Sequence, residues 1–406
     1  GPLNFTGGFF YGHDDRTYHF APYFVRYIDP ATGIGVSTIG RAGGKGDTYS
    51  AFLELTYKPS EKFELSGGAR ATIENKTGYA TTTYLQPGLA TVLGLAAPAG
   101  TYRSAKIDES NISPQVTASW HPQPDMTVFV GYRTGYKAGT ISSPTPLGLQ
   151  VTDENIALRA EDAEGFEGGF KGELFDRRLM FDITAYYYDF KNLQTQSFDS
   201  AVNATISKNA GNARTKGVDA SMTFHASEML TLRSAVGYND AKYTDFPNGT
   251  CYSGQPSVPI ASVGSPPPTG VCVVLDPLNP RTKIQNLTGA SLPRAPKWVV
   301  TLGGDLDIPL SGDLGMTLTV DALYNDGYFT SETNAPQTYQ DSYTVINASV
   351  RLHDSAKGWD LALIGRNLTD KLYIDFSGDR FFAGDGAFRG AFGAPRTIML
   401  QGTYNF

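Results

Sequence analysis

The side chains best suited to hold a ligand are a basic pair and a tyrosine pair on two separate segments. Arg133 and Lys137 lie four residues apart, and Tyr186 and Tyr188 lie two apart. In an extended chain these spacings put each pair on one side, because successive side chains alternate between two faces. Arg and Tyr suit carboxylate or catecholate ligands through charge-assisted hydrogen bonds and stacking. The alternative is that all four residues simply line a water-filled interior.

A second candidate set lies in the Gly-rich segment GDRFFAGDGAFRGAFG and consists of Arg380, Phe381 and Phe382. Binding residues are often found on loops that a rigid scaffold holds in place. Contact with lipopolysaccharide or with a neighbouring loop explains these residues equally well. Both interpretations place the segment at a surface.

The sequence shows no catalytic or metal-binding pattern. The segment 40–47, GRAGGKGD, lacks the P-loop spacing and the Ser or Thr after its lysine, so we expect a flexible loop. His13, Asp14, Asp15 and His19 are the most compact group of possible metal ligands, and we do not predict a metal site there. GxSxG, HExxH and EF-hand patterns are absent. We therefore predict neither an enzyme nor a cofactor-binding protein.

The elements that must position these residues are long strands, as the hairpin from Phe166 to Phe190 shows. On both sides of its turn at 175–177, large apolar side chains alternate with polar ones. Each strand runs to roughly ten residues or more, whereas strands of soluble proteins usually have about five or six. Tilted strands of roughly ten residues suit a bilayer. One apolar and one polar face then indicate contact with lipid outside and a polar interior.

The same unit recurs along the chain and gives about fourteen strands. Short turns alternate with loops that are often long, so the two ends of the sheet differ, as in a membrane barrel with short periplasmic turns and long extracellular loops. We expect the first strand over Leu3 to Asp14, a long loop to about Asp47, and another loop from about Glu74 to Lys106. The predicted fold is an all-β, transmembrane antiparallel β-barrel.

Composition agrees with one large sheet. Charged residues make up 18% of the 406 residues, below the roughly 25% of ordinary globular chains, and Gly and aromatic residues are abundant. The net charge of -7 does not indicate the excess of basic residues that nucleic-acid-binding proteins use to contact phosphates. Cys251 and Cys272 share one Pro/Gly/Ser-rich loop, which favours a disulfide in an oxidising compartment over free thiols or metal ligands.

Several phrases spread in order over the chain carry a family resemblance: GGFFYGHDD, YSAFLELTYKPSEKFELSGGAR, FVGYRTGYKAG, NAGNARTKGVDASMTF, LPRAPKW, GRNLTDKLY and a final TYNF. Together they resemble the C-terminal barrel portion of a bacterial TonB-dependent outer-membrane receptor of the siderophore-receptor type. Tyr404 and Phe406 resemble the signal read by the outer-membrane barrel assembly machinery, although Gly402 sits one place off the usual pattern.

The resemblance implies a 22-stranded barrel filled by an N-terminal plug, with a TonB-binding box before the plug. With about fourteen strands, residues 1–406 are expected to be the C-terminal part of such a barrel, without the plug, the TonB box and the first strands. The candidate residues on the inward face would then line the lumen, bind the ligand or contact the plug. The implied location is the bacterial outer membrane, in contact with its lipid and lipopolysaccharide.

The resemblance favours an active importer of a scarce, bulky small molecule, most often a ferric siderophore, coupled to TonB through the missing N-terminal region. The alternative is a passive porin or channel of about fourteen strands, with a lumen gated by its own loops. A third class, the outer-membrane enzymes, needs a convergent acid, base and nucleophile, and the sequence offers no such set.

Overall fold

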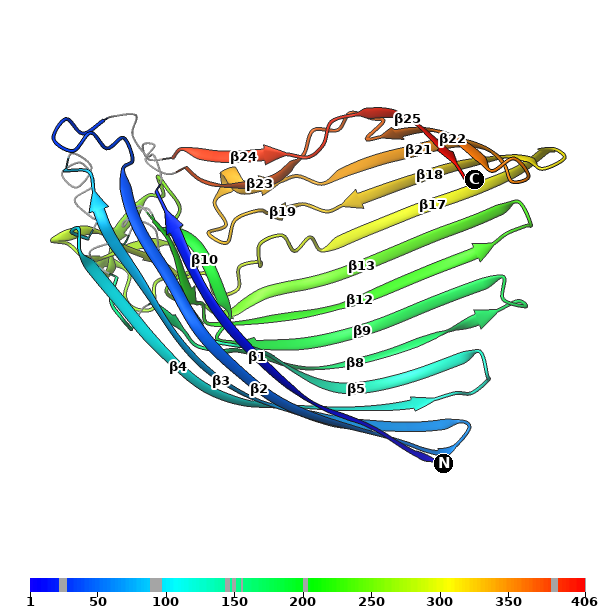
Figure 1. Ribbon diagram of the computed structural model, residues 1–406, viewed down its shortest axis with the longest axis horizontal. Coiled ribbons are helices and arrows are strands. Elements are labelled where there is room, and N and C mark those ends of the chain that lie inside the picture. Colours follow the sequence, from blue (N-terminus) through cyan, green and yellow to red (C-terminus); the bar gives the residue numbers. More distant parts are fainter. Residues whose placement is uncertain are drawn as a thin grey trace.

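The computed structural model describes residues 1–21, 28–87, 97–142, 147, 151–154, 156–199, 204–380 and 386–405. Within this part of the chain the molecule is one curved antiparallel sheet of fourteen strands, each paired with its neighbours in sequence order (Figure 1). The strand count and the antiparallel order confirm the prediction. Among the described residues the first strand and the last strand each pair with a single neighbour.

The fourteen strands of this sheet share one alternation of outward apolar and inward polar side chains. Their bounds are β1 (Leu3–Phe20), β2 (Thr38–Ser60), β3 (Phe63–Leu85), β4 (Thr101–Trp120), β5 (Met126–Lys137), β8 (Glu161–Leu174), β9 (Leu179–Lys191), β12 (Asn212–His225), β13 (Leu230–Asp245), β17 (Trp298–Ser311), β18 (Leu314–Asn325), β21 (Tyr343–Asp354), β22 (Trp359–Arg366) and β25 (Thr397–Tyr404).

Short elements lie in the loops at one end of the sheet. They are β6 (Thr140–Ile141), β7 (Ala157–Leu158), β10 (Gln194–Asp199), β11 (Ala204–Asn209), β14 (Ser257–Pro259), η1 (Ile260–Ser262), β15 (Cys272–Asp276), β16 (Asn279–Gln285), β19 (Tyr328–Phe329), η2 (Pro336–Thr338), β20 (Tyr339–Gln340), β23 (Ile374–Asp379) and β24 (Phe388–Phe392). No helix in the described ranges has the length and apolar character needed to cross a membrane.

Apolar side chains cover the outward face of the sheet instead of a core. Phe9, Ile112, Leu302 and Leu400 are all exposed on the outward positions of their strands. Aromatic residues bound this apolar zone at the long-loop end, as in the Tyr132–Phe166 pair with ring centroids 5.0 Å apart and the Tyr238–Trp298 pair at 4.8 Å. Aromatic girdles of this kind mark the interfaces between membrane and water.

The short turns all lie at one end of the sheet, where both chain termini also lie, and the long loops lie at the other end (Figure 1). In the short turn after β8, Phe175, Asp176 and Arg177 all have positive φ. The predicted turn at 175–177 and the predicted asymmetry between short and long connections are therefore confirmed. All the candidate binding residues described below lie toward the long-loop end.

Four predicted boundaries are wrong, one on each of the first four strands. β1 continues past Asp14 to Phe20, β3 ends only at Leu85, and β4 begins already at Thr101. The segment 40–47, expected to be a flexible loop, lies inside β2, which spans 23 residues. Its glycines are needed because neighbouring strands leave no room: a Cβ at Gly43 would lie 2.6 Å from the carbonyl oxygen of Arg16 and 3.0 Å from the Tyr79 ring.

These extensions form a structure that we call the wing, consisting of residues 12–20, 38–48, 75–85 and 101–110 of β1 to β4. A strand of 23 residues is about 75 Å long. It has more than twice the roughly ten residues that a strand needs to cross a bilayer. The wing therefore projects beyond the membrane. Its upper part packs on a small apolar cluster of Ala42, Ala80, Ala97 and Leu147.

Across the sheet from the wing, three long loops pack together into what we call the loop body, formed by the described parts of 246–297, 326–342 and 367–396. Cys251 and Cys272 form the predicted disulfide, with Cα atoms 5.8 Å apart. The side chain of Gln285 is buried and donates to the carbonyl oxygens of Thr250 and Thr333, at 2.7 and 3.0 Å. The loop body is thus held by side chains that cross from one loop to another.

Candidate functional site

Two of the predicted binding residues meet at one carboxylate on the inward face of the sheet. Arg133 on β5 donates through Nε to Glu167 Oε1 on β8 at 2.5 Å. The hydroxyl of Tyr188 on β9 donates to the other oxygen of Glu167 at 3.0 Å. Arg133 stays about half exposed, whereas Glu167 is largely covered. These three strands therefore present one guanidinium whose charge is already balanced within the wall.

Tyr186 belongs to a different group. It shares the inward face with Tyr188, but its hydroxyl donates to Asn239 Oδ1 on β13 at 3.2 Å. Thr215 on β12 donates to the same oxygen at 2.7 Å. The two tyrosines are neighbours on one strand, yet each one is committed to its own partner.

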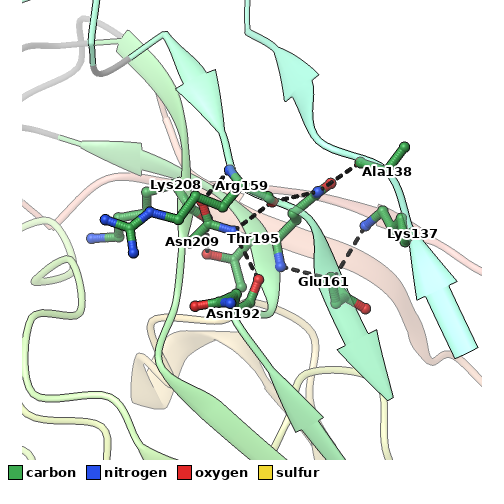
Figure 2. A network of polar contacts seen from close by, with 9 residues as sticks. Lys137, Ala138, Arg159, Glu161, Asn192, Thr195, Lys208 and Asn209 are labelled. Atoms are coloured by element: carbon green, nitrogen blue, oxygen red, sulfur yellow. Dashed lines mark hydrogen bonds and ion pairs between the residues drawn. The ribbon is translucent and has the colours of Figure 1, made fainter. Parts of the chain in front are cut away.

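Lys137 marks the upper end of β5, where the strand enters a network that joins several loops (Figure 2). Its Nζ lies 3.4 Å from Glu161 Oε2, which also accepts the main-chain N–H of Gln194 at 2.8 Å. The Gln194 amide donates to the carbonyl oxygens of Ala138 and Arg159, at 2.9 and 3.0 Å. Lys137 therefore helps to fix the hairpin of β10 and β11 over the upper ends of β5 and β8.

Arg380 lies just after β23 and is exposed, and its main-chain N–H donates to the carbonyl oxygen of Ala387 at 2.9 Å. Phe381 and Phe382 lie outside the described residues. The described residues on either side of this segment belong to a hairpin, because β23 pairs with β24. This hairpin is part of the loop body.

Sequence reasoning missed an arginine and aromatic cluster where this hairpin meets two other loops, which we call the mouth cluster: Arg294, Arg389, Phe376, Tyr328 and Asp375. The guanidinium carbons of Arg294 and Arg389 lie 5.6 and 5.9 Å from the centroid of the Phe376 ring. Within the described part of the chain, no carboxylate lies within ion-pair distance of Arg294. Arg294, Tyr328 and Asp375 line a hollow of about 240 Å³.

The mouth cluster draws on three loops, which explains why no local pattern revealed it. Arg294 precedes β17, Tyr328 follows β18, and Phe376 lies on β23. Tyr343, the first residue of β21, and Tyr373, just before β23, form a stacked pair with centroids 4.5 Å apart and planes 8° apart. The phrase LPRAPKW contains Arg294, but nothing in that phrase shows which residues the arginine meets.

A second feature lies on the inward face of β1 to β5 and reaches the upper end of β5. A hollow of about 540 Å³ is lined by charged and aromatic side chains that include Arg70, Glu74 and Tyr136. Arg70 donates to Ser50 Oγ at 2.7 Å, while Glu74 forms an ion pair with Lys76. The interior wall is thus polar along its length, as the alternation predicted.

The loop body also contains a buried carboxyl group. Asp379 is 4% exposed and accepts the main-chain N–H of Ser253 at 2.7 Å. Burial raises the pKa of the Asp379 carboxyl, and the N–H of Ser253 offsets only part of that effect. Asp379 therefore connects the last long loop to the disulfide-bonded loop.

A metal site is not visible in the described ranges, since they contain no cluster of three or more His, Cys, Asp or Glu side chains arranged to hold an ion. His13 lies within β1, not in a loop, and its Nδ1 lies 2.9 Å from Asp47 Oδ1. Arg16 donates to Asp14 at 2.6 Å, and Lys45 lies 3.0 Å from Asp15. Asp14 is thus used in an ion pair within β1, and Asp15 in an ion pair that joins β1 to β2.

Comparison with known families decides what kind of sheet this is. Residues 1–368 match the family model described as TonB dependent receptor-like, beta-barrel. This chain belongs to that family. The outward apolar face of the sheet lies in the outer membrane of a Gram-negative bacterium, and the predicted resemblance is confirmed.

Solved receptor barrels share the fold of this chain. The ferric yersiniabactin uptake receptor FyuA from Yersinia pestis superposes over 100% of this chain and 52% of its own, with a TM-score of 0.73 and 13% identity. The ferric-catecholate import receptor Fiu from E. coli K12 covers 100% and 52%, with a TM-score of 0.66 and 16% identity. The copper transporter OprC covers 100% and 54%, with a TM-score of 0.66 and 13% identity.

A curated relative is similar over a shorter stretch. The metal-pseudopaline receptor CntO of Pseudomonas aeruginosa is 33% identical over 88 residues, which is 22% of this chain and 12% of that protein. The chain spans about half the length of the solved receptors. At these identities the likeness shows the fold of this receptor barrel.

Proposed function

We propose that this receptor barrel takes up a metal chelate across the outer membrane by TonB-coupled transport, with a ferric siderophore as the favoured ligand. The mouth cluster carries the proposal. Arg294 points its guanidinium at an aromatic ring and lacks an acidic partner within the described residues, so its charge is available to a ligand. A guanidinium beside aromatic rings suits an anionic chelate that carries carboxylate or catecholate groups.

The inward wall supports a second step in the same proposal. Arg133, Tyr188 and Glu167 lie below the mouth and form a bonded set. A ligand that passes the mouth cluster would meet Lys137 at the upper end of β5, then Arg133 lower on the same strand, with Tyr188 and Tyr186 on β9. We assign Arg133, Lys137, Tyr186 and Tyr188 to the wall of the uptake route, and Arg380 with Phe381 and Phe382 to the mouth.

The names of similar proteins support a chelate and leave its metal open. FyuA and Fiu are named for ferric chelates, OprC for copper, and CntO for a metal complex of pseudopaline. We favour iron because ferric receptors are well represented among the solved neighbours. The proposed activity is binding and transport, and it requires no catalytic residue.

Energy coupling is assigned to parts that lie outside residues 1–406. We propose that a plug and a TonB-binding box precede this chain in the working receptor, together with further strands that pair with β1 and β25. The single pairing of each of these strands in the described structure supports this, because an open sheet edge in lipid would leave main-chain groups without partners. Tyr404, exposed on β25, and Phe406, outside the described residues, would serve recognition by the barrel assembly machinery.

The test is uptake of radiolabelled ferric catecholate and ferric carboxylate chelates by cells whose only receptor of this type is the full-length protein. We expect accumulation that disappears when TonB is deleted and that falls when Arg294 is changed to Gln. Uptake that persists without TonB would contradict the proposal and support a passive channel. If the cells accumulate no ferric chelate but take up copper or another chelated metal, the receptor function stands and the proposed ferric ligand is wrong.

A further inference from the structure

A small hollow in the mouth cluster is lined by two opposite charges that do not pair with each other. Arg294 and Asp375 both line the hollow of about 240 Å³, together with Asn325 and Tyr328. Both charged residues are exposed, and within the described part of the chain neither of them forms an ion pair. A guanidinium and a carboxylate that line one hollow without partners can each make a charge-assisted hydrogen bond to a ligand that carries both charges.

The backbone of Arg294 is held in a conformation that residues with a side chain disfavour. Its φ is 55° in the turn at 293–294, where glycine is the usual residue. Outside the turn at 175–177, the other described non-glycine residues with positive φ are all Asn or Asp, which tolerate this region. The N–H of Arg294 donates to the carbonyl oxygen of Phe329 at 2.7 Å, which ties the turn to β19. Strained residues of this kind cluster at ligand-binding sites.

Asp375 lies at an irregularity in the pairing of β23 with β24. The residues on either side of it pair with consecutive residues of β24, so Asp375 is the extra residue of a β-bulge. A bulge changes the direction of a side chain and is common beside functional sites. On one side of the bulge, the N–H of Ile374 donates to Gln340 Oε1 at 2.5 Å. On the other side, the hydroxyl groups of Ser377 and Thr330 are 2.5 Å apart. The loop body therefore anchors Asp375 from both sides.

The size of the hollow limits which part of a ligand can enter. Pockets that enclose a whole drug-sized molecule have volumes of about 300 to 1,000 Å³. A hollow of about 240 Å³ is smaller, so it accommodates only one end of a chelate. A compact group that carries both an ammonium and a carboxylate is a free α-amino acid end.

Asp375 also determines which chelates the hollow disfavours. A catecholate end would find a partner in Arg294 but would bring its negative charge beside the carboxylate of Asp375. Like charges at close range weaken binding, and repulsive contacts of this kind often set specificity. On the wall, by contrast, Arg133 is already bonded to Glu167. Selection between chelates by charge is therefore assigned to the mouth.

We propose that the hollow binds the free α-amino acid end of a ferric chelate, with the carboxylate on Arg294 and the ammonium group on Asp375. Asp375 is then a specificity-determining residue. It favours a chelate with a protonated amine beside its carboxylate and disfavours one that presents negative charge alone. This inference rests on the proposed uptake of a chelate and names the chemical class of that ligand.

The test titrates the full-length receptor in detergent with two ferric complexes of one trihydroxamate chelator. The first complex carries a free α-amino acid at one end. In the second, the same amine is acetylated, which removes the positive charge and leaves the carboxylate. The variant is Asp375→Asn. The matched control is Asp276→Asn, which removes an exposed carboxylate from β15 of the loop body and keeps the oxygen that accepts the N–H of Leu278.

We expect the native receptor to bind the free amino acid complex roughly tenfold more tightly than the acetylated complex, because acetylation removes one charge-assisted contact. Asp375→Asn should weaken binding of the free complex by a similar factor and should not weaken binding of the acetylated complex. The control should change either affinity by less than about twofold. Equal affinity of the native receptor for both complexes, or equal losses in variant and control, would overturn the inference and leave the proposed uptake standing.

A second variant separates ligand binding from structure at the other end of the hollow. Arg294→Gly removes the guanidinium and the disfavoured backbone conformation together, so protection of the loop body from proteases should stay about the same or rise. Binding of both complexes should fall roughly tenfold, because both carry the carboxylate. Unchanged binding in this variant would overturn the assignment of the carboxylate to Arg294. If the native receptor binds neither complex, the inference fails together with the proposed ferric ligand.

Discussion

The wing and the loop body both extend this receptor barrel beyond the membrane, but they are built differently. The wing continues four strands upward, and its main-chain hydrogen bonds follow an unbroken register from Leu3–Tyr57 to Phe20–Gly40 in the first pair. The loop body uses short strands and depends on one disulfide and on a few buried side chains such as Gln285. Figure 1 shows the β23–β24 hairpin of the loop body at the top and the upper ends of β1 to β4 at the left.

This difference has a functional consequence. A surface built on a continued sheet has side chains in fixed rows, and this suits a constant neighbour such as the outer leaflet. A body held by side chains gathers residues from distant loops, as in the mouth cluster, and can be rearranged by changing few contacts. Changes at single residues should therefore loosen the loop body and leave the wing intact.

The largest effect is expected from removal of the disulfide. Cys251→Ser with Cys272→Ser opens a loop of 21 residues, which should cost about 3 kcal/mol in the chain-entropy model. Cleavage of the segment 246–297 by a protease should speed up greatly, while segment 38–60 in β2 stays protected. Mass spectrometry of the fragments measures both. Equal protection of 246–297 before and after the change would show that the disulfide does not hold the loop body.

A smaller loss is expected from Gln285→Leu. The change leaves the carbonyl oxygens of Thr250 and Thr333 and the amide of Gln255 without their partner, at a cost of about 2 kcal/mol or more because unpaired buried polar groups lose their solvation. Hydrogen exchange of the three loops should accelerate together. The control is Gln123→Leu in the exposed turn between β4 and β5, which should leave exchange unchanged; loosening confined to one loop would contradict a shared core.

A change of pH should affect the stability of the two regions in opposite directions. The hydroxyl of Thr32, at 2.7 Å, lowers the pKa of the Asp29 carboxyl beside the wing, whereas burial raises the pKa of Asp379. The contribution of Asp29 is present above its unfolded pKa near 4 and is lost as the pH falls through the lower folded pKa. The contribution of Asp379 is full below about 4 and is lost as the pH rises through the raised pKa.

Protection from proteases is measured between about pH 3 and pH 7. Around Asp29, in the connection between β1 and β2, protection should decrease as the pH falls, whereas in the loop body it should decrease as the pH rises. Asp379→Asn keeps an oxygen acceptor for the N–H of Ser253 and should flatten the profile of the loop body alone. If protease protection of the loop body depends on pH in the same way in this variant and in the native protein, other groups cause that dependence.

How much could be predicted from the sequence differs between the same two regions. Alternation gave the outward and inward faces correctly, including the inward positions of Arg133 and Tyr188, because side-chain direction in a strand depends only on parity. It did not give their partners, since Glu167 lies on another strand and register is set by pairing. The Cys251–Cys272 bond was predictable because two cysteines in one loop have few alternatives.

The wing was missed because its composition is typical of loops. Gly40, Gly43, Gly44 and Gly46 predict a flexible segment when read alone. Yet Gly40, Gly43 and Gly44 are flanked by strands whose atoms would collide with a side chain; the Phe20 ring, for example, lies where a Cβ of Gly40 would be. The mouth cluster was missed for a different reason. Its members are separated by up to 95 residues, from Arg294 to Arg389, and only the packing of the loop body brings them together.

The most direct test of the proposed uptake route compares two arginines, one from the mouth and one from the wall. Binding of a ferric chelate to the full-length receptor is titrated for the native protein, Arg294→Gln and Arg133→Gln. We expect Arg294→Gln to weaken binding roughly tenfold, because its guanidinium has no acidic partner among the described residues, and Arg133→Gln to weaken it less than about threefold, because Glu167 already holds that charge. The reverse order would contradict the assignment of ligand capture to the mouth cluster.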